Sequence, residues 1–119
     1  IVELPFLPEE NLATVQSLLQ KKDRPTAILV SDDLFAVALE RVCIEMDIRI
    51  PEDLSIISFN NSLFARITSP QLTSIDINSV QLGIEAASQV INHIENPNLL
   101  ATKIIVPHKL IERNSCINI

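Results

Sequence analysis

The segment from Ile50 to Asp76 constrains the fold more than any other part of this 119-residue sequence. It contains two stretches with the composition of β-strands, residues 54–59 and 72–77. The polar run Asn60-Asn61-Ser62 ends the first stretch, and a short loop leads to the second. Strands that end in polar clusters are typical of open α/β sheets, in which ligands bind beyond the carboxyl ends of the strands.

Helical and strand-like patterns alternate before this segment. Residues 10–22 predict an amphipathic helix with lysines in its last turn, where positive charge suits the helix dipole. The wholly apolar residues 27–30 predict a buried parallel strand. Asp32 and Asp33 are then expected to cap a helix that runs to about Asp47. Because that helix is apolar on two sides, one side can pack on the sheet while the other needs a partner.

The sequence after residue 62 continues the alternation. Residues 63–69 predict a loop or short helix with exposed apolar side chains, and residues 79–95 predict a helix. Asn78 and Gln81 resemble a capping box at the start of that helix. Two further strands are expected at residues 103–106 and 109–112, separated by Pro107. The order of elements predicts an α/β fold with a parallel sheet flanked by helices.

Charge and cysteine content narrow the classes of protein. The net charge of −6 argues against a chain that holds nucleic acid by itself, because such domains carry a basic stripe. The cluster of Lys21, Lys22 and Arg24 is expected to be a solvated helix end. Cys43 and Cys116 lie far apart without metal-ligand spacing, so reduced thiols are expected and a structural disulfide is the less favoured alternative. The sequence shows neither an apolar run of membrane-spanning length nor a charged-then-apolar leader.

Patterns that support catalysis or cofactor binding are not evident. The single glycine, Gly83, lies in a helix pattern, whereas loops that cradle phosphates need several glycines. His93 and His108 lack a third ligand at metal spacing, and no serine has the setting of a nucleophile elbow. The sequence therefore predicts neither an enzyme nor a cofactor nor a metal site. An α/β enzyme would need catalytic groups outside this sequence.

Asp32 and Asn60 are the candidate binding residues, because each follows a predicted strand at the same edge of the sheet. A carboxylate accepts hydrogen bonds and an amide both donates and accepts them, a combination that suits the hydroxyl groups of a sugar. The alternative is that Asp32 only caps its helix and Asn60 only shapes a turn.

An ordered set of short motifs resembles the C-terminal part of the lactose-repressor (LacI/GalR) family of transcription regulators. The resemblance extends from Arg24 to near the end of the chain. The motifs are Arg24-Pro25-Thr26-Ala27-Ile28, Ser31-Asp32-Asp33, Ile50-Pro51-Glu52-Asp53-Leu54-Ser55, Phe59-Asn60-Asn61, Pro70-Gln71-Leu72-Thr73-Ser74-Ile75, Leu82-Gly83 and Leu110-Ile111-Glu112-Arg113-Asn114-Ser115. Within the family, Phe59 to Ser62 with the following Leu63-Phe64 is similar to maltose-operon repressors.

The resemblance implies a binding site and a partner for it. In that family a helix-turn-helix headpiece binds operator DNA, and a two-lobed core, like a type I periplasmic binding protein, holds a small effector between its lobes. A ligand-contacting position of the family falls on Asp32. The usual Asp of the family falls on Asn60, so an amide here replaces a pure acceptor. Asp76 and Ile77 fall on a crossover between the lobes and are expected to be effector or hinge residues.

The resemblance also implies a division of the chain. Residues 1–77 match part of the C-terminal lobe, residues 78–107 a helix and strand of the N-terminal lobe, and residues 108–119 the return crossover and C-terminal tail. The DNA-binding headpiece is not among them. Because the sequence begins with Ile1 rather than Met, we expect a fragment with exposed apolar surface. The dimer surface of the family falls on Leu34, Val37, Arg41, Phe64 and Ile67.

These features predict a cytoplasmic, sugar-responsive bacterial repressor of a carbohydrate operon, with maltose as the specific expectation. The expected partners are a sugar effector, operator DNA through the missing headpiece, a second copy of the chain and, as in some relatives, a phosphocarrier protein. The alternative is a periplasmic-type sugar-binding protein of a transport system. A secretory leader would support that alternative, and a helix-turn-helix segment upstream would exclude it.

Overall fold

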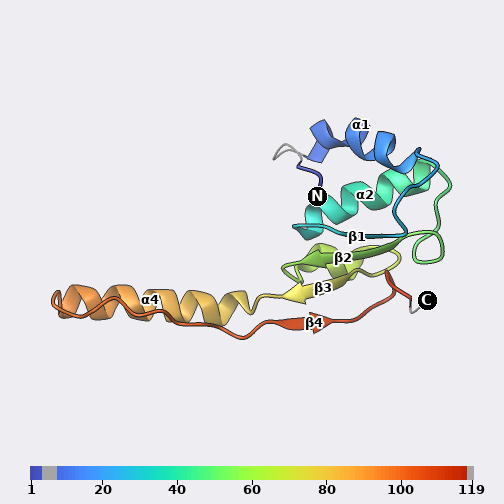
Figure 1. Ribbon diagram of the computed structural model, residues 1–119. Helices are drawn as coiled ribbons and strands as arrows, with labels where there is room; N and C mark the ends of the chain where they lie inside the picture. The colour runs from blue at the N-terminus through green and yellow to red at the C-terminus, as the bar shows by residue number, and fades with distance from the viewer. Residues whose placement is uncertain (4–7, 118–119) are drawn as a thin grey trace.

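The chain forms a four-stranded sheet with helices packed on it and one helix that extends away from it (Figure 1). The computed structural model describes residues 1–3 and 8–117. The elements, in chain order, are α1 (Pro8–Leu19), β1 (Ala27–Leu29), α2 (Asp33–Glu45), β2 (Ser55–Phe59), α3 (Leu63–Ile67), β3 (Thr73–Asp76), α4 (Ser79–Glu95) and β4 (Lys109–Ile111).

The sheet has the strand order β1-β2-β3-β4 and is mixed. The strands β1, β2 and β3 are parallel, with Ile28 opposite Ile56 in the first pair. The last strand, β4, runs antiparallel to β3, with Ile75 opposite Leu110. The α/β class is therefore confirmed, and the predicted parallel sheet is observed for β1, β2 and β3, whereas β4 is antiparallel. The reason is topological: β4 enters the sheet on the way back from α4 and meets β3 from the opposite direction.

The hydrophobic core lies between the sheet and α2, and α1 and α3 complete it. Each of the three helices contributes buried apolar residues, and the strand segments supply the opposite wall. Leu12 and Val15 of α1 pack against this core from the outside. The buried apolar residues are Leu19, Ala36, Leu39, Val42, Cys43, Leu54, Ile56, Ala65 and Leu72.

Two expectations for the N-terminal part need correction. The first helix ends at Leu19, so Lys21 and Lys22 lie beyond its last turn and do not face its dipole. The backbone turns there, with the Arg24 N–H donating to the Lys21 carbonyl at 3.2 Å, because the chain must reverse to enter β1. The strand β1 is not fully buried: within the described residues it lies at an edge of the sheet, and Leu29 is 63% exposed.

The C-terminal part confirms the extent of α4 but not its cap. Asn78 precedes α4 with a left-handed φ of 55°, and its side chain makes no capping hydrogen bond. An N-cap residue normally has an extended backbone, so the left-handed conformation does not provide the usual cap geometry. The Gln81 side chain instead donates to Glu85 at 2.8 Å. The strand expected at residues 103–106 is not formed; this segment runs beside α4 (Figure 1).

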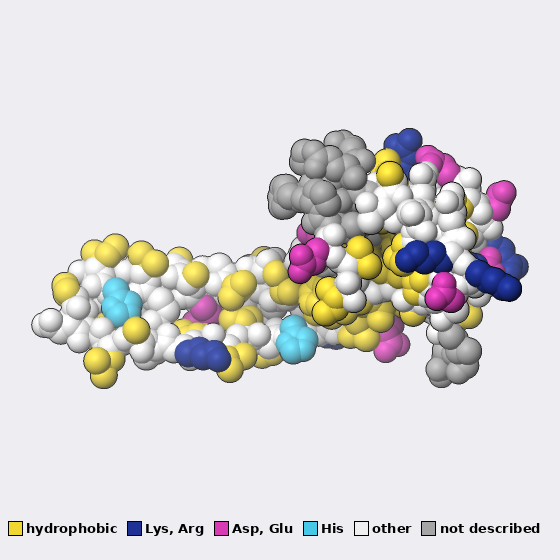
Figure 2. Space-filling view, turned by 45° about the horizontal axis from the view of Figure 1, so that its top comes forward, with side chains coloured by type: hydrophobic (Ala, Val, Ile, Leu, Met, Phe, Trp, Pro, Cys, Tyr) yellow, Lys and Arg dark blue, Asp and Glu magenta, His cyan; other side chains and the backbone are white. Residues whose placement is uncertain are grey.

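Helix α4 and the segment that returns beside it form an arm that projects from the sheet, and the molecule measures 59 Å along its longest axis. None of the residues of α4 is buried, although Val80, Ile84, Ile91 and Ile94 form an apolar stripe along it. Hydrophobic side chains are visible along this arm (Figure 2). An amphipathic helix normally buries such a stripe, so the arm presents an uncovered apolar surface.

None of the helices in the described part of the chain is long and apolar enough to cross a membrane.

One acidic side chain in α2 is buried without compensation. Glu40 is only 5% exposed, and its Oε1 atom has no hydrogen-bond partner among the described residues. Burial disfavours the charged form and raises the pKa of Glu40 from 4.5 to about 7. The folded chain therefore binds a proton at Glu40 more tightly than the unfolded chain does.

We predict that this carboxyl makes stability depend on pH between about 4.5 and 7. Its raised pKa favours the folded state at low pH, and that contribution is lost as the pH rises through the folded pKa. Relative to Glu40→Gln, the wild type should lose up to about 3 kcal/mol of unfolding free energy between the two ends of this range. Urea unfolding of the intact protein at pH 5 and pH 8 measures the difference. The exposed Glu52→Gln is the control, and a Glu40→Gln variant with the pH dependence of the wild type would contradict the prediction.

Candidate functional site

Asp32 and Asn60 meet beyond the carboxyl ends of β1 and β2. The Asn60 Nδ2 atom donates a hydrogen bond of 2.7 Å to Asp32 Oδ2. The other carboxylate oxygen, Asp32 Oδ1, accepts from the backbone N–H of Leu34 at 2.7 Å and so caps α2. Both side chains are half-buried. The Asp32 carboxylate is therefore held at both oxygens, and it holds the Asn60 amide in turn.

The loop after β2 depends on two consecutive asparagines with unusual backbone angles. Asn60 has a φ of 92° and Asn61 a φ of 48°. Asparagine adopts positive φ values more readily than most other residues, because its short polar side chain bonds locally. The Asn60 N–H also donates to the Ile75 carbonyl at 2.9 Å, which continues the pairing of β2 and β3 past the strand end. Backbone strain of this kind is concentrated at binding sites and switch regions.

The neighbouring Asp33 is the polar centre beneath this loop. Its Oδ1 atom accepts from the hydroxyls of Ser58 at 2.6 Å and Ser74 at 2.8 Å. Its Oδ2 atom accepts from the backbone N–H of Ser62 at 2.6 Å. Burial raises the pKa of Asp33, but the hydrogen bonds from Ser58, Ser62 and Ser74 outweigh it, so the pKa lies below its usual 3.8. An ionised carboxylate thus joins the start of α2 to β2, to β3 and to the loop.

The structure separates the roles of the two adjacent aspartates. Asp32 alone caps α2, whereas Asp33 is the first residue of the helix and is buried, so the expectation that both cap it is wrong for Asp33. Asp76 lies at the end of β3 and contacts the loop through Asn61, whose Nδ2 donates to Asp76 Oδ2 at 3.0 Å. Ile77 is half-buried between β3 and α4.

Sequence reasoning missed four polar residues that shape this region: Ser58, Asn61, Ser74 and Arg113. Ser58 and Ser74 are fully buried hydroxyls within strands. Ser58 gave a usable signal, because it shares the alternation of the apolar Leu54 and Ile56 and a buried hydroxyl needs a hydrogen-bond partner. Asn61 and Arg113 are 52 positions apart in the sequence, and no local pattern connects them.

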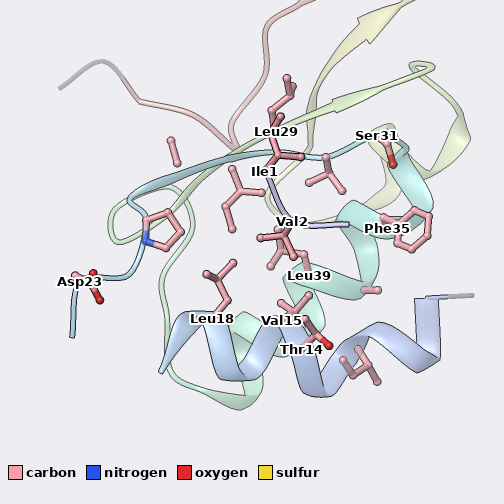
Figure 3. A pocket seen from close by; sticks show the side chains of 16 residues that line it. Ile1, Val2, Thr14, Val15, Leu18, Asp23, Leu29, Ser31, Phe35 and Leu39 are labelled. Carbon is pink, nitrogen blue, oxygen red and sulfur yellow. The ribbon is translucent and has the colours of Figure 1, made fainter. Parts of the chain in front are cut away.

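A separate cavity of about 870 Å³ lies between α1, α2 and β1 (Figure 3). Neither Asp32 nor Asn60 lines it. Most lining side chains are apolar, among them Val15 and Leu18 of α1, Leu29 of β1 and Leu39 of α2. A polar ligand would find few hydrogen-bond partners there, so the loop site is the better candidate for a hydroxylated ligand.

The described part of the chain contains no cluster of metal ligands, and its two cysteines are free thiols. Among residues 1–3 and 8–117, no three His, Cys, Asp or Glu side chains are grouped to hold a metal ion. Cys43 is buried, Cys116 is half-buried and both are free thiols, as the sequence predicts. Cys116 Sγ donates to the Ile56 carbonyl at 3.0 Å.

The helices α2 and α3 pack together and expose apolar side chains. Leu34, Phe64 and Ile67 are exposed by 44%, 43% and 64%, and Val37 is half-buried. Arg41 is exposed and forms an ion pair with Glu45 at 3.0 Å. All five residues predicted for the dimer surface therefore lie on these two helices, and none of them is fully buried in the single chain.

Comparison with known proteins identifies the family to which this domain belongs. Residues 4–116 match the family described as periplasmic binding protein-like domain. The chain belongs to the periplasmic binding protein-like domain family. The domain is similar to regulators of the LacI family in both sequence and structure.

Three relatives illustrate the similarity of the domain. The HTH-type transcriptional repressor PurR of Edwardsiella ictaluri is 36% identical over 115 residues, which are 97% of this chain and 34% of the relative. A LacI transcriptional regulator of Bacillus cereus subsp. cytotoxis superposes with a TM-score of 0.90 at 38% identity, covering 96% of this chain and 40% of that one. A LacI family regulator of Enterococcus faecalis with bound ribose has a TM-score of 0.87 at 30% identity, covering 97% and 42%. The chain spans about a third of the length of the curated relative.

We predict that Asp33→Ala lowers the unfolding free energy by about 3 kcal/mol, because two buried hydroxyls and one backbone N–H lose their acceptor. Asp33→Asn keeps the shape and one acceptor oxygen, and it should cost less. The depressed pKa of Asp33 means that its contribution is present above pH 3.8 and is lost as the pH falls through the folded pKa.

Urea unfolding of the intact protein at pH 7 and at pH 3 measures both effects. The exposed Asp23→Ala is the matched control. Equal unfolding midpoints for the wild type and Asp33→Ala at pH 7 would show that the buried carboxylate does not stabilise the fold.

Proposed function

We propose that this chain is part of the effector-binding core of a sugar-responsive transcriptional repressor. The observation that supports the proposal is the Asp32–Asn60 pair, which lies beyond the carboxyl ends of β1 and β2, where open α/β sheets commonly bind ligands. Relatives of the chain include transcriptional repressors. The protein would work in the cytoplasm and reach its operator through a segment outside this sequence.

The hydrogen-bonding capacity of the pair supports a hydroxylated effector. Both oxygens of Asp32 already accept hydrogen bonds, whereas Asn60 uses only one N–H of its amide in this pair. Asn60 therefore keeps its Oδ1 acceptor and a second N–H donor for a ligand. A sugar hydroxyl can donate to the first and accept from the second at the same time.

The same geometry explains why an amide suits position 60 in this chain. A carboxylate there would lie about as close to Asp32 as the present hydrogen bond of 2.7 Å. Two carboxylates at that distance cannot both ionise at neutral pH without strong repulsion. The resemblance implies an aspartate at this position, and we propose that its replacement by Asn60 accompanies the Asp32 carboxylate that Asn60 contacts.

For the identity of the sugar, we propose maltose or a short maltose oligomer. The resemblance of Phe59 to Phe64 to maltose-operon repressors supports this choice, and the ribose bound to the Enterococcus faecalis relative supports the sugar class. The test is operator binding by the intact protein, titrated with maltose, maltotriose, ribose and glucose phosphates. Release or tightening by one of them supports a regulator and identifies its effector. Tight sugar binding with no DNA binding would favour the transport-type protein.

The lobe assignment is also a proposal. Residues 1–77 would belong to the C-terminal lobe, residues 78–107 to the N-terminal lobe and residues 108–119 to the return crossover and tail. The projecting arm supports this division, because its apolar stripe on α4 is not covered by the sheet-bearing part of the chain.

We predict that Asn60→Gly weakens sugar binding about tenfold, because the ligand loses one donor and one acceptor. Glycine is chosen because it tolerates the φ of 92° at this position, so the fold should be unaffected. Titration calorimetry with the sugar found in the operator assay measures the affinity. Asn98→Ala, which changes an exposed residue, is the control. If Asn60→Gly bound the sugar with wild-type affinity, Asn60 would only shape the turn and would not contact the ligand.

We also predict that two copies of the chain associate through α2 and α3. A charge placed at the exposed Ile67 would be desolvated in that interface, so Ile67→Glu should convert a dimer into a monomer. Light scattering on a size-exclusion column measures the mass of the intact protein. Lys22→Glu changes an exposed residue outside this surface and should remain dimeric. A dimeric Ile67→Glu would place the interface elsewhere.

A further inference from the structure

The side chain of Asn61 joins three segments that are distant in the sequence. It follows β2, in the same loop as Asn60, and its backbone N–H donates to Ser74 Oγ of β3 at 3.0 Å. Its Nδ2 atom donates to Asp76 Oδ2 at 3.0 Å, and its Oδ1 atom accepts from Arg113 Nη2 at 2.5 Å. The amide thus uses both of its ends between a carboxylate and a guanidinium.

Arg113 is held in place independently of Asn61. Its Nη1 atom donates to the Leu72 carbonyl at 2.7 Å, and its backbone N–H donates to Thr73 Oγ1 at 3.0 Å. Arg113 follows β4, so the guanidinium ties the segment that returns from the arm to the start of β3. Asn61 therefore contacts a fixed group on this side.

Asp76 occupies the opposite side, at the base of the arm. Its Oδ1 atom accepts from the backbone N–H of Asn78 at 2.8 Å, and Asn78 has the left-handed φ of 55° that immediately precedes α4. The hydrogen bonds from Asn78 and Asn61 hold the pKa of Asp76 below its usual 3.8. The Asp76 carboxylate therefore fixes the turn through which the chain leaves the sheet for α4.

We propose that Asn61 is a positioning residue that transmits the state of the Asn60 loop to the two segments that connect the sheet to the arm. Asn60 and Asn61 share a planar peptide bond, so a shift of Asn60 on ligand binding moves the Asn61 amide relative to Asp76 and Arg113. This changes the direction in which α4 leaves the sheet. The inference rests on the proposed effector site at Asn60.

Exchanging the hydrogen-bond donor and acceptor between positions 61 and 76 tests whether this particular hydrogen bond matters, as opposed to any disturbance of the loop. Asn61→Asp places two carboxylates about 3 Å apart, in place of the present hydrogen bond. Aspartate tolerates the φ of 48°, and its carboxylate still accepts from Arg113. The double variant Asn61→Asp/Asp76→Asn restores one donor and one acceptor. The oxygen of the new amide at position 76 can still accept the Asn78 N–H.

The first readout is the factor by which maltose changes the operator affinity of the intact protein. In Asn61→Asp this factor should fall at least about fivefold, while the calorimetric affinity of the DNA-free protein for maltose changes less than about threefold. The double variant should recover the wild-type factor. Asn114→Asp adds the same charge at an exposed neighbour of Arg113 and is the matched control.

The second readout does not depend on the effector. Hydrogen–deuterium exchange at residues 77–80 should be faster in Asn61→Asp than in the wild type and should return to the wild-type rate in the double variant. Unchanged exchange in Asn61→Asp, or a double variant that stays as fast as the single one, overturns the inference. A third outcome is that exchange behaves as expected but no tested sugar alters operator binding. That result would support the role of the Asn61 contacts with Asp76 and Arg113 and would contradict the proposed sugar-responsive function.

Discussion

The ionised carboxylate of Asp33, buried between α2 and the sheet, is the interaction on which the polar end of the domain depends. It receives hydrogen bonds from Ser58 of β2, from Ser74 of β3 and from the backbone of the loop at Ser62. Burial of an unpaired charge would be strongly unfavourable, so the three donors must be present together. Asp33 therefore fixes the N-terminal end of α2 relative to both strands, and Asp32, the preceding residue, is held where it meets Asn60.

This anchoring leaves a polar edge with two layers of contacts. The outer layer is the Asp32–Asn60 pair, whose free amide groups can serve a ligand. The inner layer consists of the contacts of Asn61 with Asp76 and Arg113, which lie in the two segments that connect the sheet to the projecting arm. Asn60 and Asn61 are consecutive, so a single peptide bond joins the two layers. In our proposal, the contacts of Asp33 hold α2 and both strands in place, so that a displacement of the loop acts on the segments at Asp76 and Arg113.

Local patterns in the sequence predicted most of the elements. The apolar periodicity of residues 79–95 predicted α4 with the bounds that the structure shows, and the Asp32 cap of α2 followed from its side chain and position. The Asn60 and Asp32 side chains were expected at one edge because parallel strands end there together. The burial of Asp33 and the bridge from Asn61 to Arg113 could not be predicted, because they join residues that are far apart in the sequence.

The sequence by itself therefore determined the class of the fold, the helices and the strand ends where polar side chains gather, because these follow from short-range periodicity and capping. Only the tertiary structure decided that β4 pairs antiparallel with β3, that β1 lies at an edge of the sheet formed by the described residues, and that Asn78 adopts a left-handed turn instead of a capping box. It also decided which of two adjacent aspartates faces the core. The physical reason is that pairing direction, burial and backbone strain are set by contacts between distant segments, and identical local sequences can meet different neighbours.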